Sequence, residues 1–93
     1  MNLQQMMMQA QKIKREMDKA HAELAKQTFT VSKNGAVTVT LRGDYTVVDV
    51  KIDEDMLEKD NHEMLQELLT LALNEGLQQI SKANEAINER MQG

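Results

Sequence analysis

The chain has 93 residues, a formal net charge of −4, one Phe, one Tyr, no Trp and no cysteine. A chain of this length forms one domain, so we expect residues 1–93 to fold as a single unit whose core is poor in large aromatic side chains. The composition excludes disulfide bonds. No apolar run approaches the roughly 18 residues of a transmembrane helix, and residues 1–17 lack the pattern of a signal peptide, so we expect a cytoplasmic protein without membrane contact.

The first predicted element is a helix over residues 2–26. Its apolar side chains recur with spacings that alternate between three and four residues, which is the a/d seam of a heptad repeat. This narrow stripe is typical of a helix that packs on another helix. Its members are Leu3, Met6, Ala10, Ile13, Met17, Ala20 and Leu24.

Three strands follow, because the apolar period changes from about 3.6 residues to two after Lys26. The strands cover residues 28–32, 37–41 and 45–52, and they form an antiparallel meander with one wet face. We expect inward-facing side chains in the third strand at Val48, Val50 and Ile52.

Two turn signals separate these strands. Asn34-Gly35 is typical of a type I′ hairpin turn, which requires a positive φ at both central residues. Gly43-Asp44 predicts a second turn of two residues.

The last predicted element is a helix over residues 61–91, preceded by an acidic stretch that holds a turn or a single helical turn. The first half of this helix is apolar nearly all round, and its apolar stripe then narrows and ends at Met91. The fold class is therefore α+β, in the order α-β-β-β-α.

Element lengths predict a homodimer. The two helices would be about 36 and 45 Å long, whereas strands of this length extend only about 20 Å, so the sheet leaves much of both helices uncovered. A second copy in a two-fold interface covers them most simply, and the alternative is a loosely packed monomer. The predicted interface residues are Met64, Leu65, Leu68, Leu69, Leu71, Ala72 and Leu73.

Over residues 2–91 the chain resembles the YbaB/EbfC family of bacterial nucleoid-associated proteins. The resemblance rests on the opening NLQQMMMQAQKIKREM, Gly35-x-Val37-x-Val39, Gly43, Val48-x-Val50-x-Ile52-Asp53, Leu69, Ala72 and residues 74–76. It implies a tweezer-like homodimer of α-β-β-β-α domains that binds DNA, lies in the cytoplasm or nucleoid, affects gene expression and catalyses no reaction.

Charge is distributed unevenly along the chain. Residues 1–26 carry a net charge of +2, residues 27–52 carry +1, and residues 53–93 carry −7. On the first helix, Lys12, Arg15, Lys19 and Lys26 form a basic stripe about 21 Å long at outward c and f positions. Lys14 lies beside this stripe at an e position. We predict that these five side chains bind the phosphates of double-stranded DNA, although solvated coiled-coil helices carry charges at the same positions.

The sequence offers little for other chemistry. His21 and His62 are lone histidines that we expect to be solvated, and no serine has a base beside it. We therefore expect no enzyme activity, no metal, no cofactor and no small-molecule substrate.

A protein–protein adaptor without a nucleic-acid role is the alternative function. The acidic region 53–93 suits a basic protein partner better than DNA. Met8, at an outward f position, is an apolar side chain that the helix seam does not explain.

Overall fold

The computed structural model describes residues 2–92, and the surroundings of side chains up to Arg90. The apolar stripe of the last predicted helix is expected to end at Met91, whose side chain lies outside the described residues. The two terminal residues of the predicted 1–93 domain also lie outside them. The elements are α1 (Leu3–Lys26), β1 (Thr28–Lys33), β2 (Val37–Arg42), β3 (Val47–Ile52), the 3₁₀ turns η1 (Glu54–Leu57) and η2 (Lys59–Asn61), and α2 (His62–Gln92). The predicted α-β-β-β-α order is confirmed.

A side-chain cap starts α1. The Asn2 side chain accepts a hydrogen bond from the Gln5 backbone N–H at 2.8 Å, and the Gln5 side chain accepts one from the Asn2 N–H. This capping box satisfies two of the N–H groups that a helix start leaves without partners. At the other end, only Gln27 separates α1 from β1.

The first hairpin turn is confirmed and the second is corrected. Asn34 and Gly35 have φ angles of 55° and 66°, as the predicted turn requires. The second loop is longer than the predicted two residues. It is closed by a hydrogen bond of 2.8 Å from the Arg42 N–H to the Thr46 carbonyl. Its positive φ of 69° falls on Tyr45, so β3 begins at Val47.

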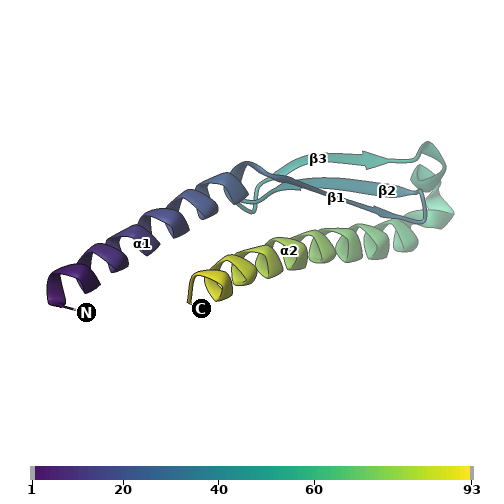
Figure 1. The fold of residues 1–93 in the computed structure, drawn as a ribbon. Coiled ribbons are helices and arrows are strands. Elements are labelled where there is room, and N and C mark those ends of the chain that lie inside the picture. The colour runs from purple at the N-terminus through teal and green to yellow at the C-terminus, as the bar shows by residue number, and fades with distance from the viewer. Residues whose placement is uncertain (1, 93) are drawn as a thin grey trace.

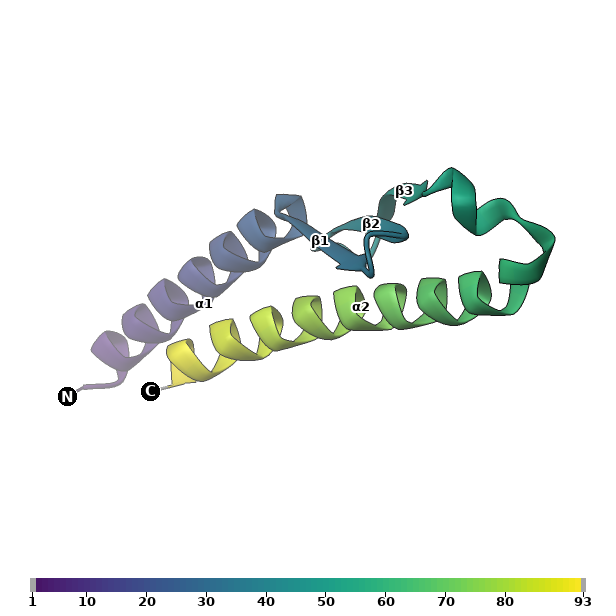
Figure 2. The ribbon, with the colours of Figure 1, turned by 90° about the vertical axis from the view of Figure 1, so that its right-hand side faces the viewer.

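The core lies between α2 and the sheet, whose strand order is β1-β2-β3. Figures 1 and 2 show α2 running along one face of this sheet. The helix packs on β1 and β2, and its facing side chains in β2 are completely buried: Val37, Val39 and Leu41. Gly76 permits this approach, because a Cβ there would lie 2.6 Å from Leu41 Cδ1.

The prediction that β3 faces the core is wrong for Val48 and Val50. The register shifts between Thr40 and Leu41, so Val48 has no partner on β2 and the strand bulges there. Val50 pairs with Val39 and shares its face, yet it is 42% exposed, whereas Val39 is buried. The reason is that α2 covers β1 and β2 and leaves β3 outside its reach.

The molecule is long and thin. Its extents are 69 × 18 × 14 Å and its radius of gyration is 19.3 Å, against about 12 Å for a compact chain of this length. In both views α1 projects beyond the sheet as an arm, and its N-terminal half lies farthest from the sheet (Figures 1 and 2). The predicted helix–helix packing of the α1 seam therefore occurs only near its end, and Leu3 at the other end is 72% exposed. No helix in the described part is long and apolar enough to cross a membrane.

Candidate nucleic-acid interface

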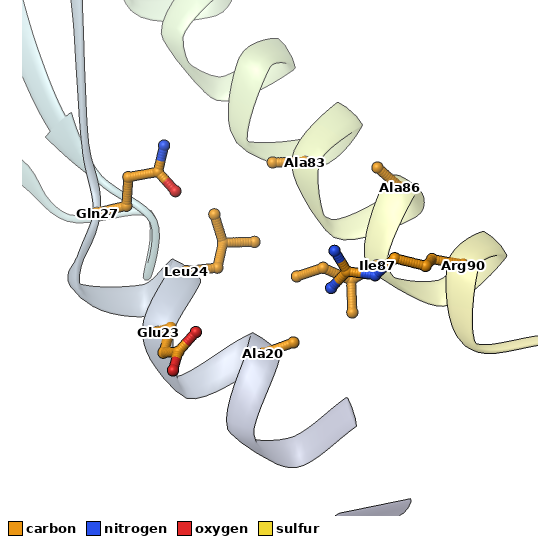
Figure 3. Close-up of a pocket in the computed structure, with 8 residues that line it drawn as sticks. All are labelled: Ala20, Glu23, Leu24, Gln27, Ala83, Ala86, Ile87 and Arg90. Atoms are coloured by element: carbon orange, nitrogen blue, oxygen red, sulfur yellow. The ribbon is translucent and has the colours of Figure 1, made fainter. Parts of the chain in front are cut away.

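The structure exposes all five predicted DNA-binding side chains, and all five belong to α1. They are Lys12, Lys14, Arg15, Lys19 and Lys26. Figure 3 shows Leu24, a seam residue, on the side of α1 that faces α2. The basic stripe occupies c and f positions, which lie on the other side of the helix from the seam. The stripe therefore faces away from the rest of the molecule.

These charges have no carboxylate partner within the described part of the chain. The single ion pair among those residues joins Lys33 of β1 to Glu75 of α2. Arg15 and Lys19 are like charges one helical turn apart, which mildly destabilises an isolated helix. An anion between them would remove that repulsion, so the stripe is electrostatically suited to phosphate.

A shallow hollow of about 300 Å³ lies on the arm beside the stripe. Its lining residues are Gln5, Met8, Gln9, Lys12 and Arg15. Met8 is 63% exposed, so the structure brings this unexplained apolar side chain to the same surface as two basic ones. That surface combines charge, amide groups and one apolar contact.

A crevice of about 400 Å³ separates the C-terminal end of α1 from α2 (Figure 3). Small side chains from Ala20, Ala83 and Ala86 keep it open, and the buried side chains of Leu24 and Ile87 lie within it. Glu23, Gln27 and Arg90 complete its lining. Arg90, an isolated basic residue in an acidic helix, thus lies at the junction of the two helices.

The prediction that His21 is solvated is wrong. The ring is half-buried between the helices, with Nδ1 at 3.0 Å from Asn84 Oδ1 and Nε2 at 3.0 Å from Asn88 Oδ1. Asn84 and Asn88 are one turn apart on α2, a spacing visible in the sequence, but periodicity could not tell which turns of the two helices are adjacent. His62 is exposed as expected, beside Gln66.

The loop between β2 and β3 lies against the end of α1. The Gly43 N–H donates to the Gln27 carbonyl at 2.8 Å, and a Cβ on Gly43 would lie 1.8 Å from the Leu24 carbonyl oxygen. In the same loop, hydrogen bonding by the Thr46 side chain lowers the pKa of the Asp44 carboxyl below its usual range. The contact of Gly43 with the end of α1 thus fixes the point at which the arm leaves the sheet.

The seven predicted interface residues of α2 divide into three groups. Leu68 and Ala72 are buried against the chain's own sheet, and Leu65, Leu69 and Leu73 are partly buried around the same core. Met64 and Leu71 are exposed and remain accessible to a partner. Sequence reasoning missed a further set of exposed apolar side chains, namely Tyr45, Val47, Val50 and Leu77.

Comparisons relate the chain to known proteins. The profile of the YbaB/EbfC DNA-binding family matches residues 1–93. The chain is 40% identical over 87 residues to the nucleoid-associated protein LBA0378 of Lactobacillus acidophilus, covering 92% of this chain and 78% of that one. It is 42% identical over 86 residues to the nucleoid-associated protein str1598 of Streptococcus thermophilus, covering 91% and 87%. The crystal structure of the uncharacterized protein HP0035 from Helicobacter pylori superposes with a TM-score of 0.81 at 26% identity, covering 100% of this chain and 99% of that one.

Proposed function

The chain belongs to the YbaB/EbfC DNA-binding family, and from that membership we propose that it is a nucleoid-associated protein that binds double-stranded DNA through the arm of α1. The observation that carries this proposal is the basic stripe, an exposed set of cations on a projecting helix that form no ion pair with any carboxylate of the described residues. Such a stripe binds phosphates, which gives affinity with little dependence on base sequence.

The arm suits DNA better than the body of the molecule does. Residues 53–93 carry a net charge of −7, which repels a polyanion from α2 and the turns before it. The positive charge of α1 is greatest on the side that faces away from α2. A duplex that approaches the stripe therefore meets cations first and stays distant from most of the carboxylates.

We also propose that the protein acts as a homodimer. The chain exposes 7001 Å², whereas a compact monomer of this length would expose about 5,500 Å². The excess of roughly 1,500 Å² is larger than the approximately 800 Å² that each partner buries in a standard interface. Part of the excess is the projecting arm, and a second copy would cover much of the remainder.

The strongest candidate for that interface is the face of β3 that continues the buried face of β2 but is not covered by α2. Val47 and Val50 pair with Leu41 and Val39, which are fully buried, yet they are 48% and 42% exposed. Leu77 on α2 adds to the exposed apolar surface. Together with Met64 and Leu71, these side chains are apolar groups that a folded soluble domain normally covers. A two-fold dimer would also present two arms to one duplex.

The proposed role is one of binding without catalysis, in the cytoplasm and on the nucleoid, where it would affect nucleoid organisation and gene expression. The names of the relatives support this location. Phosphate contacts from a dimer with two arms would connect or shape DNA segments, and such an effect requires neither a cofactor nor a small-molecule substrate.

A protein–protein adaptor is the second candidate. The acidic charge of residues 53–93 and the exposed Met8 favour it, because a basic partner would match the first and an apolar contact the second. This alternative predicts that the protein does not bind DNA at any salt concentration.

Fluorescence anisotropy distinguishes the two. A labelled duplex of about 30 base pairs is roughly 100 Å long, longer than the protein, and it is titrated at low and moderate salt. The DNA proposal expects saturable binding that weakens steeply with salt, and no binding at low salt would overturn it. The double variant R15E/K19E should lose binding, whereas the matched control K59E/K82E, with the same change in net charge at exposed positions off the arm, should retain it.

A further inference from the structure

The arm depends on a small area of contact for its direction. Among the described residues, the last turns of α1 lie against α2 near Ala20 and Leu24 (Figure 3), whereas residues 2–10 are exposed and project away from the sheet (Figure 1). Along the helix axis, Lys12 is about 14 Å from His21 and Leu3 is about 27 Å from it. A tilt of about 10° at His21 would therefore move Lys12 by about 2 Å and Leu3 by about 5 Å.

Apolar packing alone does not set that tilt. The contact of Leu24 and Ile87 excludes water and holds the two helices together, but hydrophobic attraction is non-directional. The small alanines around it leave a crevice instead of interlocked side chains. Fixing the rotation and tilt of α1 requires directional contacts, which hydrogen bonds provide.

His21 supplies such contacts with both ring nitrogens. Its Nδ1 and Nε2 each lie 3.0 Å from a side-chain oxygen, of Asn84 and Asn88 respectively. One ring thus spans a full turn of α2. A ring held at two points can neither rotate nor slide along α2 without losing at least one hydrogen bond.

The orientation of Asn84 is itself determined. Its Nδ2 donates to the Ile80 carbonyl at 3.3 Å and to the Tyr45 hydroxyl at 3.5 Å, so its Oδ1 faces Nδ1 of His21 and can accept a hydrogen bond from it. On the other side of the ring, Asn88 presents its Oδ1 to Nε2, and its NH₂ group would take the same place if the amide turned over, so Nε2 has a partner as donor or as acceptor.

Tyr45 connects this group to the sheet. Its hydroxyl lies 3.3 Å from Ser81 Oγ, and its backbone has the positive φ that side-chain-bearing residues rarely adopt. The loop that holds Tyr45 also contacts the end of α1 through Gly43. The hydrogen-bonded group therefore joins α1, α2 and the β2–β3 loop at the root of the arm.

We propose that His21, Asn84 and Asn88 are positioning residues that hold the arm at the angle at which the basic stripe engages DNA. This inference rests on the proposed DNA binding. None of the three contacts the nucleic acid in this account; they act through the direction of α1. Loss of their hydrogen bonds leaves the phosphate contacts available but widens the distribution of arm directions. Because only a fraction of the molecules then has the direction that binds, the affinity for DNA falls.

Two readouts test the proposal together. Because the chain has no cysteine, the exposed pair Gln11→Cys and Glu85→Cys can carry spin labels on the arm and on α2. Labelled chains are diluted into unlabelled ones, so that the distance within one chain dominates. DNA affinity and its salt dependence are measured on unlabelled protein. The variants are His21→Leu and Asn88→Ala, with His21→Gln as the conservative replacement and His62→Leu as the matched control on an exposed histidine.

We expect His21→Leu and Asn88→Ala to broaden the distance distribution and to weaken DNA binding by about tenfold, the equilibrium effect of one to two lost hydrogen bonds. The slope of log affinity against log salt should stay that of the wild type, because no phosphate contact is removed. His21→Gln should recover part of the affinity, and His62→Leu should change neither readout. Asn88→Ala keeps the test open if His21→Leu fails to fold.

Three results would overturn the proposal: a distance distribution that stays narrow in both variants, a broadened distribution with unchanged affinity, or a reduced salt slope, which would make His21 a direct phosphate contact. A wild type that binds no DNA would overturn the proposed function instead. The distance measurement, made without DNA, separates that failure from a failure of the hydrogen bonds to orient the arm.

Discussion

Gly43 lies so close to Leu24 that a Cβ on the glycine would sit 1.8 Å from the Leu24 carbonyl oxygen. The obstacle is backbone at the end of α1, which cannot move aside as a side chain can. We predict that Gly43→Ala lowers the free energy of unfolding by about 2–3 kcal/mol, the usual cost of forced overpacking. Chemical denaturation measures it at one fixed protein concentration, because the stability of the proposed dimer would depend on concentration.

Gly35→Ala is the matched control for that variant. Gly35 has a φ of 66° and nothing within 4 Å of an added Cβ, so only backbone strain opposes the substitution. The expected cost is about 1 kcal/mol. A loss at Gly43 no larger than the loss at Gly35 would mean that the loop moves away from α1 easily.

Gly76 and Leu41 form a second tight contact, between α2 and the centre of the sheet. A Cβ on Gly76 would lie 2.6 Å from Leu41 Cδ1. We predict that Gly76→Ala destabilises the protein by about 1–3 kcal/mol. In a Leu41→Ala background the same change should cost much less, because the clashing methyl group is gone. A double-mutant cycle by denaturation measures this coupling, and additive costs would contradict it.

The salt dependence of DNA binding reports the number of stripe cations that meet phosphate. Four contacts predict a log–log slope of about −4 for each arm engaged. Replacing Arg15 by Gln should reduce the magnitude of the slope by about one and weaken binding equally on unrelated sequences. Anisotropy titrations on two duplexes of different sequence measure both effects. A loss confined to one duplex would instead assign Arg15 to base recognition.

The exposed side of β3 predicts where the proposed dimer would form. Val50→Asp places a charge on the face that Val50 shares with Val39, so it should raise the dimer dissociation constant by at least about tenfold. Analytical ultracentrifugation over a range of concentrations measures the change. Thr28→Asp, an exposed position on the outer face of β1, is the control. If Val50→Asp and Thr28→Asp have the same dimer dissociation constant, this side of β3 is excluded from the interface.

The order of elements and the position of the basic stripe could be read from the chain alone, because both depend on local patterns. The three-and-four spacing from Leu3 to Leu24 specifies a helix and, with it, the outward positions of Lys12 and Arg15. The Asn34-Gly35 pair specifies a hairpin, since its backbone conformation is a local property of those two residues.

The remainder depended on which surfaces meet. Periodicity places Val50 on the apolar face of a strand, but its exposure follows from α2 lying over β1 and β2 instead of over β3. It places His21 on the flank of a helix, but its two hydrogen bonds follow from the particular turn of α2 that lies opposite. Gly43 shows the same contrast: a turn explains a glycine there, yet its necessity comes from the Leu24 carbonyl. Spacing along the chain determined the faces of each element, whereas the contacts between faces, being non-local, were decided only by the tertiary structure.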